Sequence, residues 1–213
     1  GVLLESTGAG ETLLKYAFRL TQKTRGGPAH AAILASGLFG TMSGSPVANI
    51  VGTGTFTIPI IKKRGFSPAF AAGVEATASC GGQIMPPIMG AGGFLMAELT
   101  GTDYLTIMKI AIFPAILYFL SVFAMVHFEA KKLGLRGLPK EELPDWKKIL
   151  KEEWFLASPL IVIISMMIVG YSPGMAAFWA IIACVVASQF VPDHRMGLRE
   201  ILDAICTGAN NTL

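Results

Sequence analysis

We predict an all-α integral membrane protein, and three features of the sequence predict it. Apolar residues make up 53% of the 213 residues and charged residues only 15%, whereas about a quarter of the residues of a soluble domain are charged. Two apolar stretches, residues 29–61 and 66–99, are longer than the roughly 20 residues with which a helix crosses a bilayer. Glycine and proline interrupt both stretches near the middle. We therefore expect a re-entrant hairpin and a broken helix.

The first stretch, residues 29–61, predicts the re-entrant hairpin. Ser43-Gly44-Ser45-Pro46 divides it into two halves that are each too short to span a bilayer. Basic residues flank both ends, with Lys23 and Arg25 before it and Lys62, Lys63 and Arg64 after it. Both ends are therefore expected on the same side of the membrane, with the tip at depth.

The second stretch, residues 66–99, predicts a broken helix that crosses the membrane. Gly81-Gly82 and Pro86-Pro87 interrupt it. The residues that precede it are basic, but Glu98 and Asp103 stand at its other end. Different flanks indicate that its two ends lie on opposite sides.

The remaining segments alternate between surface elements and spans. In chain order we expect the end of a membrane helix (1–10), an amphipathic arm (11–23), a span (104–128), a charged linker (129–153), two spans (154–170 and 173–191) and a second amphipathic arm (196–206). If the hairpin opens to the cytoplasm, this order places 16 of the 17 basic residues on the cytoplasmic side. Only Lys109 lies elsewhere, and we expect its side chain to snorkel to the outer interface. The hairpin and the 129–153 loop are thus predicted to face the cytoplasm.

Polar side chains at the hairpin tip form the first candidate site. Ser43, Ser45 and Asn49 offer three oxygen atoms within seven residues, and an unwound segment adds backbone carbonyls. These are ligands for a cation such as Na⁺. The N-terminus of the second arm, near Val47, would direct free N–H groups at an anionic substrate. The alternative is that the hydroxyl groups merely bond to their own helices.

The interruption of the second stretch is the second candidate site. Thr77, Ser79 and Gln83 carry side-chain oxygens, and Gly81 and Gly82 free backbone carbonyls at depth. Two unwound segments that face each other near the midplane are typical of a secondary transporter.

Glu75 is an acid well inside an apolar stretch, which by default makes it a candidate functional residue. Two interpretations stay open. It carries a proton or a cation, or its carboxyl group is hydrogen-bonded to a neighbouring break as a structural brace.

Other classes of function find less support. The histidines form no pair for a transition metal, and the cysteines lack metal spacing; these residues are His30, His127, His194, Cys80, Cys184 and Cys206. Basic residues are spread over loops, so we expect no nucleic-acid partner. No nucleophile–base motif or Walker lysine is present, and we expect no enzyme activity. An intramembrane enzyme that uses Ser45 or Glu75, and a channel with a re-entrant filter, are the alternatives.

At this point the residues point to a family. The run GLFGTMSGSPVANIVGTGTFTIPIIKKRGFSPAFAAGVEATASCGGQIMPPIMGAGGFLMAE, residues 37–98, closely resembles the large membrane subunit of TRAP (tripartite ATP-independent periplasmic) transporters, the DctM-like subunit. It is most similar to the type with fused small and large subunits (4TM/12TM) that works with a TAXI-type receptor. The rest of the chain is consistent with this resemblance.

The resemblance implies an elevator-type secondary transporter with inverted repeats in a bacterial or archaeal cytoplasmic (inner) membrane. Residues 1–128 would be the first repeat, 129–153 a cytoplasmic linker and 154–213 the start of the second repeat. It further implies symport with Na⁺, without an organic cofactor, and import of an organic acid such as a dicarboxylate. The implied partners are a periplasmic TAXI-type receptor, a small membrane subunit or its fused equivalent, and the lipid bilayer. A cation-coupled carrier of similar architecture that needs no receptor is the nearest alternative.

The resemblance also assigns expected roles to individual residues. Those expected to bind Na⁺ are Ser43, Gly44, Ser45, Asn49, Gly81 and Gly82. Those expected to bind the substrate are Ser45, Pro46, Thr77, Ser79, Gln83 and Pro86. The second hairpin and its broken helix are absent from this sequence, so we expect it to be a piece of a longer protein that holds about half of the site.

Overall fold

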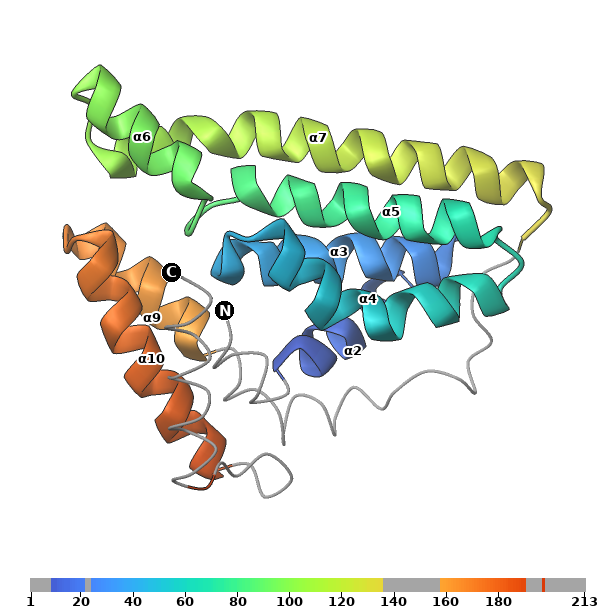
Figure 1. Cartoon of the computed structure of the whole chain (residues 1–213), viewed down its shortest axis with the longest axis horizontal. Helices are drawn as coiled ribbons and strands as arrows, with labels where there is room; N and C mark the ends of the chain where they lie inside the picture. The colour runs from blue at the N-terminus through green and yellow to red at the C-terminus, as the bar shows by residue number, and fades with distance from the viewer. Residues whose placement is uncertain (1–8, 22–23, 136–157, 191–196, 198–213) are drawn as a thin grey trace. The chain divides into compact units, whose positions relative to one another are not determined.

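The structure is a computed structural model that describes residues 9–21, 24–135, 158–190 and 197. All secondary structure in these residues is helical, as expected for the predicted fold class. The chain forms two units, residues 13–144 and residues 1–12 with 145–213, and each is described by itself. Figure 1 shows the helices in chain order.

The predicted hairpin is a pair of packed helices, α3 (Gly27–Ser43) and α4 (Pro46–Lys63). Helix α3 ends at Gly44, whose φ of +60° is a conformation that residues with a Cβ rarely adopt. Ser45 then caps α4, because its hydroxyl accepts a hydrogen bond from the N–H of Ala48, and Pro46 starts the new helix. The chain therefore turns at the residues that the sequence singled out.

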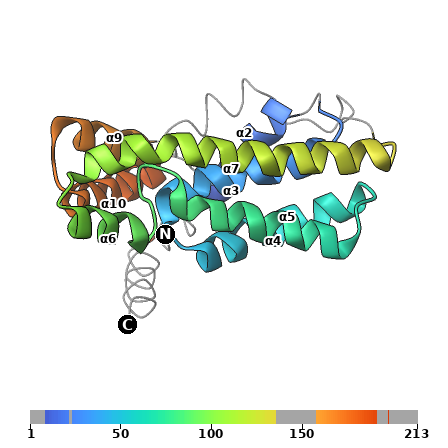
Figure 2. The same cartoon turned by 90° about the horizontal axis from the view of Figure 1, so that it is seen from above.

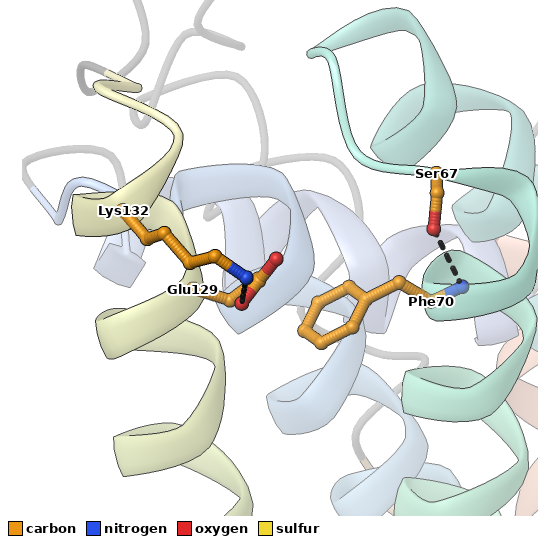
Figure 3. A network of polar contacts seen from close by, with 4 residues as sticks. All are labelled: Ser67, Phe70, Glu129 and Lys132. Carbon is orange, nitrogen blue, oxygen red and sulfur yellow. Dashed lines mark hydrogen bonds and ion pairs between the residues drawn. The ribbon is translucent and has the colours of Figure 1, made fainter.

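The predicted broken helix is also interrupted where expected. Helix α5 (Pro68–Gly81) is followed by a 3₁₀ turn, η1 (Gly82–Ile84), and helix α6 (Ala91–Thr100) begins only after Gly90. The start of α5 is capped by Ser67, whose hydroxyl accepts a hydrogen bond of 3.2 Å from the N–H of Phe70 (Figure 3).

Helix α7 (Tyr104–Lys132) runs beside α5 (Figures 1 and 2). It has 29 residues, and among the described residues it is the one helix that by length and composition can cross a membrane alone. It continues past the predicted end at residue 128, so the first residues of the predicted linker are helical. Glu129 and Lys132 form an exposed ion pair of 3.5 Å in its last turn (Figure 3).

The other helices of the described residues lie at both ends of the chain. Helix α2 (Ala9–Thr21) packs on α3, with Ala17 against Ala31 and Ala35. In the second unit, α9 (Ser158–Val169) packs against α10 (Pro173–Phe190). The predicted arm at 196–206, apart from Gly197, most of the linker, and the ends of the predicted spans at 154–157 and 191 lie outside the described residues, as do residues 1–8.

The first unit buries a set of polar side chains beside its apolar core and leaves large apolar side chains exposed on its outside. Asn49, Thr53 and Glu75 are buried between α3, α4 and α5. By contrast, Ile110 and Phe113 of α7 are 64% and 71% exposed. Such an outer surface suits contact with lipid or with further transmembrane helices.

Glycine allows the backbone of α3 to contact the backbone at the start of the break. A Cβ at Gly40 would lie 2.4 Å from the Cα of Gly82, and a Cβ at Gly82 would lie 2.7 Å from the Cα of Gly40. Real Cβ atoms do not approach backbone so closely, and membrane helices use small residues in this way. The contact fixes the level at which the hairpin meets the broken helix.

Basic residues gather at one end of the first unit. Gly26, before α3, lies against the side chain of Val126, and Gly65, after α4, lies against Leu135 at the end of α7. This end therefore carries the cationic residues that flank the three helices, namely Arg25, Lys62, Lys63, Arg64, Lys131 and Lys132. At the opposite end of α7, the turn after α6 carries Asp103, and α6 itself carries Glu98.

Gly40→Ala should destabilise the protein. The new Cβ must push the backbone at Gly82 away, and overpacking of this kind costs about 1–3 kcal/mol. Thermal unfolding of the full-length protein in detergent measures the effect as a lower Tm. The control is Gly73→Ala in α5, where a Cβ meets nothing within 4 Å and alanine is the better helix former. Equal losses in the two variants would contradict the Gly40–Gly82 contact.

Candidate functional site

The tip of the hairpin lies against the end of the break. The N–H of Ile88 donates a hydrogen bond of 3.1 Å to the carbonyl of Thr41. A Cβ at Gly44 would lie 3.3 Å from the carbonyl oxygen of Ile88 and 3.4 Å from that of Met89, and a Cβ at Gly90 would lie 3.1 Å from the carbonyl oxygen of Gly44. Three backbone oxygens thus gather where the two interrupted helices meet.

The hydroxyl groups of the tip are weakly engaged. Ser43 Oγ donates to the carbonyl of Ser45 at 3.3 Å and accepts from its N–H at 3.4 Å, and Ser45 Oγ accepts from Ala48 at 3.4 Å. These distances are near the outer limit for a hydrogen bond. Ser45 is exposed, and Pro46 beside it has no N–H. Both hydroxyls can therefore turn toward a ligand at little cost.

Asn49 points into the unit. It is fully buried, and its Nδ2 donates a hydrogen bond of 2.8 Å to the carbonyl of Ser36 on α3. The same nitrogen would lie 3.2 Å from a Cβ at Gly82. Asn49 thus ties the two arms of the hairpin together beside the glycine crossing. Its expected part in binding Na⁺ stays a prediction.

The glycines of the break pack against neighbouring helices. Gly82 meets Gly40 of α3, whereas a Cβ at Gly81 would lie 2.5 Å from the ring of Tyr118 on α7. The hydroxyl of Tyr118 donates to the carbonyl of Thr77 at 2.8 Å. Helix α7 therefore packs against the C-terminal end of α5 through Tyr118.

Ser79 lies on α5 before the break and faces inward. Its side chain is buried, and its hydroxyl donates to Glu75 Oε1 at 3.3 Å. The structure therefore brings Ser79 together with Glu75 rather than with the tip. The expected contacts of Thr77 and Ser79 with substrate stay predictions.

Gln83 is exposed beside a cavity of about 380 Å³ that the break, α6 and α7 line. Most of its lining is apolar, including Met89, Met96 and Ile107, while Gly90 and the first residues of α6 contribute backbone. Pro86, half-buried, precedes this segment in the break.

Residues 88–90 are absent from the set that the sequence predicted. That set ends at Pro86, but Ile88 and Met89 supply the carbonyls nearest to the tip and Gly90 allows the close approach. The glycine-rich run that follows Met89 was the available signal that the break extends to Gly90. Within the parts of the chain that the structure describes, no three His, Cys, Asp or Glu side chains gather as in a metal site. A cation at the tip would meet carbonyl and hydroxyl oxygens.

Comparisons with known proteins point to one family. The family model for the DctM component of the tripartite ATP-independent periplasmic transporter matches residues 1–213. The sialic acid TRAP transporter permease protein SiaT of Haemophilus influenzae is 28% identical over 193 residues, 90% of this chain and 31% of the relative. The sialic acid TRAP transporter large permease protein SiaM of Vibrio cholerae is 29% identical over 178 residues, 83% of this chain and 41% of the relative.

A relative that is named for a different substrate matches at a similar level of identity. The C4-dicarboxylate TRAP transporter large permease protein DctM of Pseudomonas aeruginosa is 27% identical over 192 residues, 90% of this chain and 44% of the relative. The chain thus spans between about a third and a half of the length of these relatives. Because the family model matches the whole chain, the chain belongs to the DctM component family of TRAP transporters, whose members are transporter permeases and not enzymes.

Proposed function

We propose that the protein to which this chain belongs imports an organic acid by symport with Na⁺, and that the acid is delivered by a periplasmic receptor. The observation that carries the proposal is the contact between two interrupted helices, where Thr41 of the hairpin bonds to Ile88 of the break. Non-helical backbone at membrane depth is tolerated only where protein buries it or where it lines a site. Paired breaks of this kind hold ions and substrates in secondary transporters.

The proposed ion site is the meeting point itself. The carbonyls of Gly44, Ile88 and Met89 and the hydroxyls of Ser43 and Ser45 offer oxygen ligands without a formal charge. A Na⁺ ion held there keeps its full positive charge in apolar surroundings, which is costly. An organic anion next to it reduces that cost, and this mutual stabilisation is the physical basis of symport.

The proposed substrate is a carboxylate. The N-terminus of α4 at Ser45, Pro46 and Val47 and the amide of Gln83 suit an anion with oxygen acceptors. The relatives are named for sialic acid and for C4-dicarboxylates, which are carboxylic acids. Relatives of similar identity are named for two different acids. This supports a carboxylate as the class of substrate and does not select one acid.

The basic end of the first unit supports a cytoplasmic opening of the hairpin in a cytoplasmic (inner) membrane. The remaining features of our proposal are a TAXI-type receptor, a fused small subunit, inverted repeats, and an elevator movement of the hairpin and broken helix. Because the chain covers less than half of these relatives, the other half of the site would come from the rest of the protein.

Uptake by the full-length protein in proteoliposomes, with its receptor and a labelled carboxylate, should require an inward Na⁺ gradient. Replacing Na⁺ by K⁺ on both sides should abolish accumulation, because the oxygen site would lose its ion. Uptake of equal rate and extent in K⁺ would refute the coupling. Uptake without the receptor would instead favour a receptor-independent carrier.

Ser43→Ala should raise the Na⁺ concentration for half-maximal uptake about tenfold, which corresponds to about 1.4 kcal/mol. The hydroxyl has only long hydrogen bonds, so its loss should leave the Tm in Na⁺-free buffer unchanged. Ser121→Ala is the matched control, since Ser121 is exposed and its hydroxyl bonds to the carbonyl of Tyr118 within α7. An unchanged Na⁺ requirement in Ser43→Ala would remove this hydroxyl from the site.

Cysteine labelling in intact cells tests the orientation of the hairpin. In a full-length chain without native cysteines, Asp103→Cys should react with a membrane-impermeant maleimide and Lys63→Cys should not. Both positions are exposed at opposite ends of the first unit. After lysis Lys63→Cys should react, and the reverse pattern in intact cells would invert the proposed topology.

A further inference from the structure

Glu75, near the middle of α5, lies at the centre of a hydroxyl cluster. Its side chain is 0% exposed. Oε1 accepts hydrogen bonds from Ser36 of α3 at 2.8 Å, from Thr53 of α4 at 2.5 Å and from Ser79 of α5 at 3.3 Å. Oε2 accepts one from Thr57 of α4 at 2.5 Å. We call these four donors and Glu75 the hydroxyl cluster.

Hydroxyl groups surround the carboxyl group of Glu75. An ionised carboxylate has about four acceptor sites and no proton of its own, whereas a protonated carboxyl must also find an acceptor. Each of the four hydroxyls has a single proton to donate. Hydrogen bonds from these hydroxyl groups offset the cost of burying a polar carboxyl group.

The cluster fastens the hairpin to the broken helix. Three of the four donors belong to the hairpin, and the acceptor belongs to α5, so these bonds join residues that are 18 to 39 positions apart in the sequence. A Cβ at Gly54 would lie 3.2 Å from Cγ of Glu75, so a glycine here leaves room for the carboxyl side chain.

The cluster continues toward the tip through Asn49. Thr53 Oγ1 lies 2.8 Å from the carbonyl of Asn49 and 3.3 Å from its Oδ1, so Asn49 and Glu75 compete for one hydroxyl proton. Asn49 Nδ2 in turn bonds to the carbonyl of Ser36, whose hydroxyl bonds to Glu75. Asn49 also touches the Gly40–Gly82 crossing. A connected set of contacts therefore leads from Glu75 to the level of the break.

We propose that Glu75 is a positioning residue for the ion site at the tip: it does not touch the ion but holds the hairpin at the place where the carbonyls of Gly44, Ile88 and Met89 converge. The proposal rests on the proposed function of the tip. Glu75 stands seven residues before Gly82, or roughly 10 Å along the helix. All four of the hydrogen bonds that its carboxyl group accepts come from hydroxyl groups of α3, α4 and α5, and none comes from Ser43 or Ser45 of the tip.

Thr57→Val is the sharpest test, because Thr57 lies twelve residues from Ser45, roughly 18 Å along α4. The variant removes one donor to Glu75 and keeps the side-chain shape. In proteoliposomes made with the full-length protein and its receptor, the Na⁺ concentration for half-maximal uptake should rise about fivefold or more. Thr57→Ser restores the hydroxyl and should restore the value. Thr55→Val is the control, since Thr55 is exposed on the same helix.

Glu75→Gln tests the carboxyl group itself. The amide keeps the shape, but its NH₂ group cannot accept a hydrogen bond, so at least one hydroxyl loses its acceptor. We expect a raised Na⁺ requirement with an unchanged number of Na⁺ ions per substrate, read from the reversal potential. A changed number would make Glu75 a carrier of an ion or proton and overturn the positioning role.

The remaining outcomes separate this inference from the proposed function. If the variants lower only the Tm and leave the Na⁺ requirement of the folded protein unchanged, Glu75 is a purely structural brace and the inference fails. If wild-type uptake does not depend on Na⁺ at all, the proposed function fails, and the inference fails with it.

Discussion

The carboxyl group of Glu75 joins three helices of the first unit, and the arrangement of the unit depends on it. In a soluble core, helices are driven together by burial of apolar surface, but in lipid the outer surface is as apolar as the inner one. Directional contacts must then decide how the helices are placed. The hydroxyls of Ser36, Thr53 and Thr57 supply such contacts from both arms of the hairpin. They fix the register of the hairpin against α5.

Close backbone packing is the second constraint. It lies one or two helical turns from the Glu75 contacts, on the side of the hairpin tip. Gly40 and Gly82 touch without side chains, and this places the end of α5 against α3. Helix α5 ends beside this crossing, so the residues that follow it can return toward the hairpin tip. The hydrogen bond from the N–H of Ile88 to the carbonyl of Thr41 then holds this segment against the hairpin. The break is thus a consequence of how tightly the helices meet as well as of the local prolines.

These two constraints bear on the ion site that we propose at the tip. In that proposal, the packing of the helices would set the distances between the carbonyls of Gly44, Ile88 and Met89. The tip itself stays adaptable, because the hydroxyls of Ser43 and Ser45 are held by long hydrogen bonds alone. Such hydroxyls beside packed backbone would suit the proposed ion site, which must bind an ion and then release it.

The sequence by itself determined the class of the fold and the places where its helices stop. Length, hydropathy and the positions of glycine, proline and serine are local properties, and they predicted the hairpin turn at Ser43–Pro46 and the interruption after Gly81. The same run of residues carried the resemblance to the family to which the chain belongs.

The directions of the side chains were decided only by the tertiary structure. Asn49 and Ser79 carry small polar side chains as Ser43 and Ser45 of the tip do, and no local signal in the sequence separates them. The structure turns both inward, one to the carbonyl of Ser36 and one to Glu75, and it places the carbonyls of Ile88 and Met89 beside Gly44 of the tip. Which oxygen faces a site depends on the crossing of helices that are distant in the chain, because a helical side chain points wherever the packing of its helix directs it.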